Sequence, residues 1–456
     1  MPQEQSIASY LSSAQALFNI LKQDYQDNGT PRVFMGSTNY WMAGNVFDTT
    51  LDYMLLAIRK GIITPQEVDG VMAYVAKNYD LAYQTYNANY GYYASDNGTR
   101  SDHGMVHMEP AEPKGFWYDD FAWWGIASAK VYAPEYQTIF RNNMSQYKTI
   151  AGACWQVMNN GFQGDPDRPI QWGAPNVWAQ CDKSKFGQYE PRFNGGVWQS
   201  DMNNQYDPGC KNLGPFQDTV VNALYLVLAL RMDKAINTTT QIAREYQFLT
   251  TWCFDISIPT DKQLYYSFGT NTGIVLERIS TYKNGLPVPP VDWHDQHCAW
   301  TGDQGLMLGA MVDYLMLQPG ATPARNLITG IMQGVASQMQ ENSILSPWYP
   351  LTPDNPLKGT DAADYASGIG VYMRYLLYAY NNNATVRQMV GANTAGIKDM
   401  IISAANACVN HTFPTYGNGI FDLFNQLSTL ITAATILQGA ENAAVAETAE
   451  ADSSAH

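Results

Sequence analysis

The sequence predicts an all-α protein, an (α/α)6 toroid of six antiparallel helix pairs with long loops gathered on the active-site face. Apolar residues recur at helical spacing in about twelve segments of the 456-residue chain, and no convincing run of alternating strands occurs. Short links between these segments alternate with long ones. A ring of this kind can bury one continuous core at this length, so the chain need not divide into several domains.

The helix candidates cover most of the chain. They span roughly 5–26, 45–61, 65–86, 117–133, 135–160, 216–233, 238–255, 300–317, 322–340, 363–381, 385–411 and 420–438. We expect residues 1–438 to form a single catalytic domain. Residues 439–456 are small and acidic, and are expected to form a disordered tail.

The lengths of the links place the loops. Links after even-numbered helices are short, such as "ITP" near residue 62 and "PGAT" near residue 319, and short links join antiparallel neighbours. Links after odd-numbered helices are long and cover 87–116, 161–215, 256–299 and 341–362. These loops should therefore share one face with the N-termini of the even-numbered helices. Because several of those helices begin with Gly, Ala and polar residues among aromatics, we expect them to form the inner ring.

Composition excludes several classes of partner. The formal net charge of −15 repels nucleic-acid backbones and anionic membrane surfaces, so neither is expected to bind. Only 15% of residues are charged while 13% are aromatic. This balance suits a neutral oligo- or polysaccharide, because aromatic faces stack on sugars while amides and carboxylates bind hydroxyls. The protein is expected to be a monomer.

Motifs for metals and cofactors are not found in the sequence. The six cysteines include no CxxC pair, and no phosphate-binding GxxxxGK[ST] or GxSxG elbow occurs. The pairs His103 and His107, and His294 and His297, lack the HExxH form and fall in predicted loops. We therefore expect neither a metal nor a cofactor.

The stretch "FWYDDFAWWGIASAKVY", residues 116–132, carries the candidate catalytic pair Asp119 and Asp120. A helix N-terminus stabilises a nearby carboxylate, whereas flanking aromatics and the like charge raise the pKa of whichever aspartate lacks donors. One ionised and one protonated carboxyl group is the pair that glycoside hydrolysis needs. The structural alternative is an Asp N-cap followed by a second Asp that interacts with the helix dipole.

The segment "WYDDFAWWGIA" resembles the signature of glycoside hydrolase family 76, the bacterial endo-α-1,6-mannanases, whose fold is an (α/α)6 barrel. Further similar segments follow in the family's order: "NGGVWQ" (194–199), "FQDTVVNALYLVLALRM" (216–232), "WTGDQGLMLGAMVDYL" (300–315) and "GIGVYMRYL" (368–376). The resemblance spans roughly residues 40–380. It implies retaining cleavage of α-1,6 linkages in an α-mannan-type polysaccharide, with Asp119 as nucleophile and Asp120 as acid/base.

Other side chains are expected to bind sugar at the mouth of the ring. The aromatic candidates are Trp41, Trp117, Tyr118, Trp198, Trp293 and Trp300, and the polar candidates are Asp218, Asn222, Asp303 and Gln304. The alternative role for each Trp is packing of the long loops.

The chain departs from the family's pattern at two places. Gln217-Asp218 stands where the family often has Lys-Asn, and Gly302-Asp303 stands where it usually has Tyr-Asn. Both changes keep or add an acceptor while removing a cation or an aromatic ring, so the mouth could carry four carboxylates. We hypothesise altered subsites, for a different linkage or an amino-bearing sugar.

Other functions remain open at this point. A catalytically silent glycan-binding protein of the same fold is one, and another (α/α)6 enzyme, an epimerase or an unsaturated glycuronyl hydrolase, is the second. Epimerases should place histidines at the cavity, whereas most histidines here fall in predicted loops. A secreted or periplasmic location is expected, although residues 1–11 contain no basic segment followed by a long apolar stretch.

Overall fold

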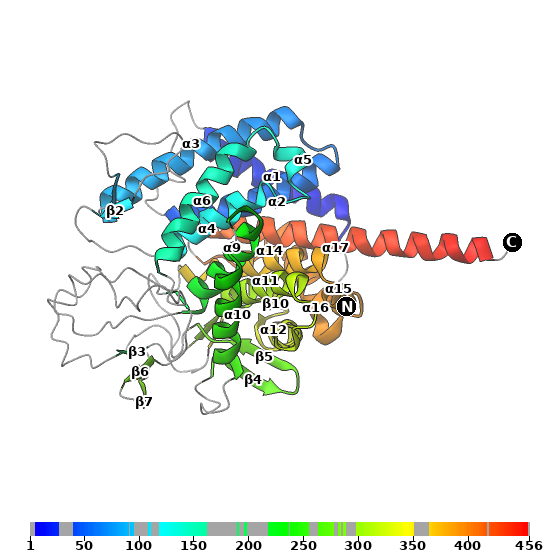
Figure 1. The fold of residues 1–456 in the computed structure, drawn as a ribbon. Helices are drawn as coiled ribbons and strands as arrows, with labels where there is room; N and C mark the ends of the chain where they lie inside the picture. The colour runs from blue at the N-terminus through cyan, green and yellow to red at the C-terminus, as the bar shows by residue number, and fades with distance from the viewer. Residues whose placement is uncertain are drawn as a thin grey trace.

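Helices dominate the computed structural model, as the sequence predicts (Figure 1). The structure describes residues 5–26, 40–90, 92–94, 108–110, 118–161, 189–190, 196–197, 218–236, 238–254, 263–277, 281–283, 286–288, 298–350, 364–416 and 419–454. The prediction of an all-α (α/α)6 architecture is confirmed, and the observed helices lie close to the predicted segments.

The inner ring consists of the even-numbered helices of the predicted series. These are α2 (Tyr40–Arg59), α4 (Tyr118–Lys130), α9 (Thr219–Ile236), α11 (Thr301–Leu317), α14 (Gly368–Asn382) and α17 (Gly419–Ser454). Each contacts the next in this order, and α17 contacts α2, which closes the ring. In α11 every residue from Thr301 to Asp313 is buried, as expected for a helix that is surrounded on all sides.

The outer helices pack against this ring. They are α1 (Ile7–Gln26), α3 (Pro65–Tyr90), α6 (Met144–Asn160), α10 (Thr239–Phe254), α12 (Thr322–Gln338) and α16 (Ile397–Val409). α3, α6, α10 and α12 each contact the inner helix that they follow in sequence, while α1 and α16 pack against α17. The short links make each pair antiparallel, so the N-termini of the inner helices lie at one end of the ring, together with the C-termini of the outer helices.

Two predicted outer helices are divided. The segment 135–160 splits into α5 (Gln137–Phe140) and α6, and the segment 385–411 splits into α15 (Ala384–Gly391) and α16 around the 3₁₀ turn η4 (Thr394–Gly396). Asn393, Ala395 and Gly396 have φ values of 52°, 53° and 81°. An α-helix cannot continue through left-handed residues, so the chain turns there.

Short strands that the sequence did not predict lie in the connections. They are β1 (Tyr92–Ala94), β2 (Met108–Pro110), β3 (Tyr189–Glu190), β4 (Tyr265–Gly269), β5 (Thr272–Val275), β6 (Thr281–Lys283), β7 (Leu286–Val288), β8 (Cys298–Trp300), β9 (Gln340–Glu341), β10 (Ile344–Leu345) and β11 (Trp348–Pro350). All pairings are antiparallel: β1 with β2, β4 with β5, β9 with β10, β8 with β11, and β6 between β3 and β7. The β8–β11 pair places Trp348 opposite Trp300 and so joins the connections around α11 and α12.

The C-terminal helix corrects the expectation of a disordered tail. α17 continues to Ser454, so residues 439–454 are helical and extend beyond the ring (Figure 1). Its part Gly419–Ala440 is long and apolar enough to cross a membrane, and 83% of its most apolar window is buried inside the protein. Contacts with α1, α2, α14 and α16 account for that burial, as in a core helix.

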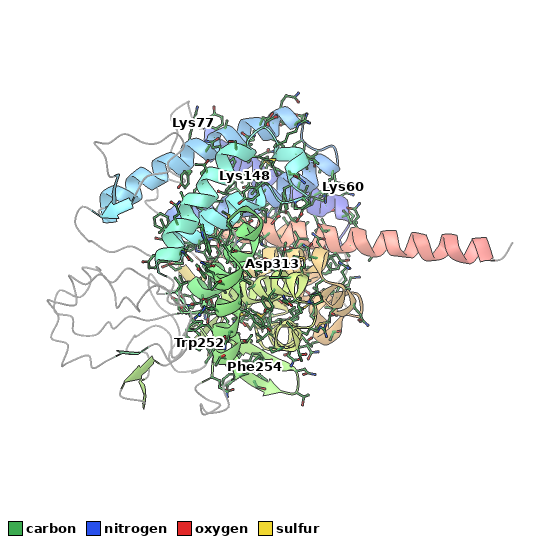
Figure 2. The ribbon with its side chains drawn as sticks, in the orientation of Figure 1. Lys60, Lys77, Lys148, Trp252, Phe254 and Asp313 are labelled. Atoms are coloured by element: carbon green, nitrogen blue, oxygen red, sulfur yellow. The ribbon has the colours of Figure 1, made fainter. Side chains whose placement is uncertain are left out.

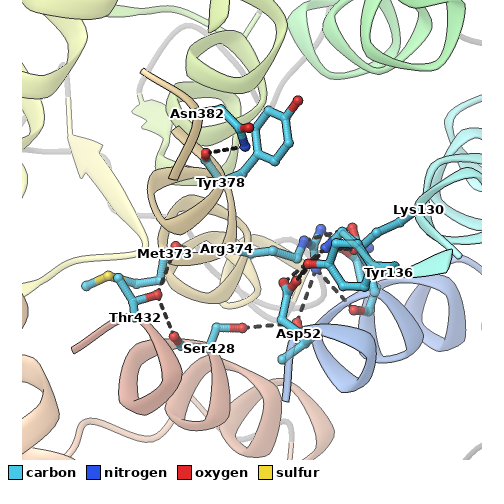
Figure 3. Close-up of polar contacts among 12 residues, drawn as sticks. Asp52, Lys130, Tyr136, Met373, Arg374, Tyr378, Asn382, Ser428 and Thr432 are labelled. Atoms are coloured by element: carbon cyan, nitrogen blue, oxygen red, sulfur yellow. Dashed lines mark hydrogen bonds and ion pairs between the residues drawn. The ribbon is translucent and has the colours of Figure 1, made fainter. Parts of the chain in front are cut away.

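A network of charged side chains lies inside the ring. The cations are Lys130, Arg231 and Arg374, and the carboxylates are Asp48, Asp52 and Asp313. Lys130 Nζ is 2.9 Å from Asp52 Oδ1 and also pairs with Asp48. The Tyr136 hydroxyl donates a hydrogen bond to Asp52 Oδ1, the oxygen that Lys130 also contacts (Figure 3). Asp313 lies among the central helices, whereas the exposed Lys60, Lys77 and Lys148 lie at the periphery (Figure 2).

Arg374 joins three inner helices through this network. Its Nε is 2.9 Å from Asp48 Oδ2, and its other nitrogens donate to the carbonyl and the side-chain oxygen of Asn45 at 3.0 and 2.9 Å. Its guanidinium also lies 5.9 Å from the ring centroid of Trp123 in α4. Although burial acts to raise it, Arg374 and Lys130 hold the pKa of Asp48 below its ordinary value. α2, α4 and α14 are therefore linked by buried ions as well as by apolar packing.

Gly44→Ala is expected to lower the free energy of unfolding by about 1–3 kcal/mol, because it forces α2 and α4 apart. A Cβ at Gly44 would lie 3.0 Å from the backbone nitrogen of Trp124 and 3.1 Å from Trp123 Cβ. Urea denaturation measures the loss. The control is Gly70→Ala in α3, which meets nothing within 4 Å and should gain up to about 1 kcal/mol from helix propensity. An unchanged urea midpoint for Gly44→Ala would contradict the close approach.

Candidate active site

The N-terminal turns of the inner helices, with the residues just before them, form the rim of the ring, and several carboxylates lie on it. Asp119 and Asp120 occupy the first turn of α4, Asp303 the first turn of α11 and Asp422 the first turn of α17. Asp218 directly precedes α9. Unpaired N–H groups at a helix start stabilise negative charge, so the rim can hold acids that the apolar core could not.

Asp119 is half-buried, and Asp120 beside it is 7% exposed. The Oδ1 atom of Asp119 is out of contact with solvent and has no hydrogen-bond partner among the described residues. Burial, then the charges of Asp120 and Asp218, raises the pKa of Asp119 well above its usual range. The N–H groups of Asp119 and Asp120 oppose this shift without cancelling it. Asp119 therefore keeps its proton to a higher pH than an exposed carboxyl group does.

Asp218 has a structural task as well as an electrostatic one. Its Oδ1 accepts a hydrogen bond of 2.9 Å from the N–H of Val221, which caps the start of α9. Its charge reaches Asp119, which shows that the two carboxyl groups lie near each other. Asp218 and Asp303 are both fully buried. The rim therefore gathers the four predicted carboxylates, but the structure presents neither of these two to solvent.

Asn222 and Gln304, predicted to bind sugar hydroxyls, form hydrogen bonds within the protein. Asn222 accepts from the N–H of Val197 at 2.7 Å and donates to the carbonyls of Val197 and Asp218 at 3.3 and 2.6 Å. Gln304 forms the equivalent pair with Val275 and also donates to the carbonyl of Trp300 at 2.9 Å. Both side chains are fully buried, so their amides hold connections against inner helices instead of facing a ligand.

The aromatic candidates divide into two groups. Trp300 is 7% exposed and donates through Nε1 to the carbonyl of Tyr365 at 3.0 Å, and Tyr118 is 6% exposed. Both pack the rim, which is the alternative role for aromatics in long connections. Trp41 stays half-buried, with ring centroids 5.1 Å from Phe421 and 6.4 Å from Trp123, so it remains a candidate for sugar stacking. Trp117, Trp198, Trp293 and Gln217 lie outside the described residues, as do the four histidines of the two pairs.

Glu245 is a buried acid that sequence reasoning did not single out. It belongs to the outer helix α10, yet it is fully buried and its Oε2 accepts a hydrogen bond of 3.0 Å from the N–H of Gly196. A glutamate among the polar residues of an amphipathic outer helix carries no signal that distinguishes it from a solvated one. Within the described residues, no group of three or more acidic, His or Cys side chains is arranged to hold a metal ion.

Solved structures share the fold of this chain. An inactive variant of an α-1,6-mannanase from Salegentibacter sp. HEL1_6, in complex with α-1,6-mannotriose, is 14% identical with a TM-score of 0.55, covering 94% of this chain and 99% of its own. A glycoside hydrolase family 76 α-mannanase from Bacteroides thetaiotaomicron is 10% identical with a TM-score of 0.51, covering 95% and 97%. Dfg5 from Chaetomium thermophilum, in complex with glucosamine, is 12% identical with a TM-score of 0.55, covering 95% and 92%.

These likenesses confirm the predicted resemblance to glycoside hydrolase family 76 at the level of the fold. No protein-family model and no curated protein matches the sequence.

Proposed function

We propose that this protein is a glycoside hydrolase that cleaves α-1,6-mannoside linkages by a retaining double displacement. The observation that carries the proposal is the adjacent pair Asp119 and Asp120 on the rim, where burial and like charge raise the pKa of Asp119. The fold shared with α-1,6-mannanases supports it. The Salegentibacter mannanase variant also supports the proposal, because it is inactive and has two consecutive aspartates replaced by asparagine.

In the proposed first step, the Asp119 carboxylate forms a bond to the anomeric carbon while the glycosidic C–O bond breaks. Asp120 donates its proton to the departing oxygen. In the second step Asp120 takes a proton from water, the resulting hydroxide attacks the anomeric carbon, and the ester bond to Asp119 breaks. Two inversions leave the product with the configuration of the substrate.

The first step needs Asp119 ionised and Asp120 protonated. In the free protein, however, the raised pKa of Asp119 favours a proton on Asp119. For Asp119 to act as nucleophile, sugar binding has to move that proton to Asp120. The alternative assignment uses the same pair, with Asp119 as acid and Asp120 as nucleophile. Trapping with azide distinguishes the two assignments.

Digestion of a glycan panel tests the proposed function. Wild-type protein incubated with α-1,6-mannan should release mannooligosaccharides, detected by thin-layer chromatography and mass spectrometry, and should leave α-1,4- and β-1,4-linked glycans intact. If no glycan on the panel is cut and the Asp119→Asn variant binds mannan as well as wild type does, the chain is a glycan-binding protein of the same fold. Release of an epimerised sugar would favour the other (α/α)6 enzymes.

A subsite for an amino-bearing sugar is the finer part of the proposal. Asp218 and Asp303 add two carboxylates to the catalytic pair, and a negative rim favours a cationic amine through the summed potential. The glucosamine bound to Dfg5 is consistent with such a ligand. Glucosamine should therefore inhibit mannan hydrolysis more strongly than N-acetylglucosamine, and Asp303→Asn should remove the difference. Equal inhibition by both sugars in the wild type would rule this subsite out.

A further inference from the structure

We infer that Glu245 is a positioning residue for the catalytic pair, acting through residues 196–197 and Tyr118 to keep the Asp119 carboxyl buried. The inference rests on the proposed function for its catalytic meaning, but its structural part can be measured without substrate.

Two buried side chains bind the backbone of residues 196–197. Glu245 Oε2 accepts the N–H of Gly196 at 3.0 Å. Asn222 accepts the N–H of Val197 at 2.7 Å and donates to its carbonyl at 3.3 Å. Gly196 has a φ of 82°, in the left-handed region that side chains other than glycine disfavour. The clamp therefore fixes a backbone turn between an outer helix, α10, and an inner one, α9.

The clamped segment and the residue before Asp119 pack against the same glycine. A Cβ on Gly161, which follows α6, would lie 2.7 Å from Cε2 of Tyr118 and 2.9 Å from Cγ1 of Val197. Both side chains therefore line Gly161, beside the start of α4. Burial is the largest cause of the raised pKa of Asp119, and this packing is where Glu245 would act on that burial.

Glu245 binds the Gly196 N–H as a neutral, protonated acid. No ion pair to it occurs among the described residues, its Oε1 has no hydrogen-bond partner there, and its side chain is fully buried. Burial raises the pKa of Glu245 well above its usual range, and the N–H of Gly196 opposes the shift only in part. A glutamine has the same shape and keeps the acceptor, so Glu245→Gln should preserve the clamp while Glu245→Ala removes it.

The pH dependence of carboxyl labelling tests the positioning role. Full-length protein is treated with a carbodiimide and an amine at a series of pH values, and peptide mass spectrometry gives the midpoint for labelling of Asp119. Asp120 and Asp218 are the charged neighbours that act on this midpoint, and all variants retain them. Glu245→Ala should lower the midpoint by about one pH unit or more, because looser packing hydrates the carboxylate. Glu245→Gln should leave it unchanged.

Two further variants separate positioning from general loss of stability. Gly196→Ala strains the same turn without touching a charge, so it should lower the midpoint as Glu245→Ala does, and it carries the test if Glu245→Ala does not fold. Thr238→Ala removes a buried hydrogen bond of 2.6 Å to the carbonyl of Ala229 at the opposite end of α9 and α10. It should lower the melting temperature and leave the Asp119 midpoint in place.

Activity supplies the second readout. Glu245→Ala and Gly196→Ala should lower kcat for mannan roughly 10- to 100-fold with little change in KM, as expected when a reacting group is misplaced. Folded Glu245→Ala and Gly196→Ala variants with a wild-type Asp119 midpoint would overturn the inference. If the midpoint moves as expected but wild type cuts no glycan, the positioning role stands and the proposed function fails.

Discussion

Replacing either Asp119 or Asp120 with alanine is expected to reduce hydrolysis of α-1,6-mannan by at least about a hundredfold. Loss of a general acid or base alone costs roughly 10²–10⁴ in rate, and loss of a nucleophile removes the covalent route. Initial rates of mannooligosaccharide release from α-1,6-mannan measure the effect, with mannan binding as a control for folding. Asp422→Ala, on the same rim at the start of α17, should cost far less, because Asp422 accepts from the Tyr416 N–H and its charge is not among those that raise the pKa of Asp119.

Azide distinguishes the two roles within the pair. A small anion can enter the space left by the missing carboxyl group and react at the anomeric carbon. In the acid/base variant azide intercepts the glycosyl-enzyme, and the mannosyl azide keeps the configuration of the substrate. In the nucleophile variant azide attacks directly and gives the inverted product. The proposal expects inversion for Asp119→Ala and retention for Asp120→Ala, and the reverse result would establish the alternative assignment.

The same pair should reduce stability at neutral pH. The raised pKa means that folded Asp119 keeps its proton in a pH range where the unfolded chain releases it. Its contribution is thus most favourable below about pH 4 and is lost as pH rises, by about 1.4 kcal/mol for each pH unit up to the folded pKa. Asp119→Asn should therefore melt at a higher temperature than wild type at pH 7 but not at pH 4. Equal melting temperatures at pH 7 would contradict the raised pKa.

Arg374→Met is expected to be the most destabilising single substitution considered, with a loss of about 3–5 kcal/mol. It removes the guanidinium that pairs with Asp48 at 2.9 Å and donates to both oxygens of Asn45 (Figure 3). Among the described residues, Asp48 then keeps Lys130 as its ion-pair partner and the more distant charge of Arg231. Urea denaturation at pH 7 gives the change in unfolding free energy. The double variant Asp48→Asn/Arg374→Met should recover part of the loss, because no unpaired charge stays buried.

An exposed ion pair provides the matched control. Lys22 Nζ lies 3.4 Å from Glu67 Oε1, with the side chains 22% and 43% exposed. Lys22→Ala should cost less than about 1 kcal/mol, because solvent screens such pairs. If Arg374→Met costs no more than Lys22→Ala, the buried network does not hold α2, α4 and α14 together in the way described here.

The helices and their order could be predicted from the sequence for a simple reason. Periodic apolar residues mark the buried face of each helix, and link lengths mark which neighbours are antiparallel, so both signals are local. The adjacent Asp119 and Asp120 were located at a helix start by the same reasoning. The breaks at 141–143 and 393–396 were missed because a turn of a few residues barely disturbs a helical period.

The roles of the other candidate site residues depended on partners distant in sequence. Asn222 and Gln304 have the chemistry of sugar ligands, but the fold places Val197 and Val275 against them, and buried amides then satisfy backbone groups first. Glu245 binds the N–H of Gly196 because its helix, α10, packs against α9.

By itself, the sequence determined the ring of helices, the end on which the long connections gather and the position of the acidic pair at that end. Only the tertiary structure decided which polar side chains are used for internal hydrogen bonds, which acid of an outer helix is buried, and that ions balance one another inside the ring. The physical reason is that periodicity encodes which face of a helix is buried, whereas a hydrogen bond or ion pair is defined by its partner, and the partner is chosen by packing.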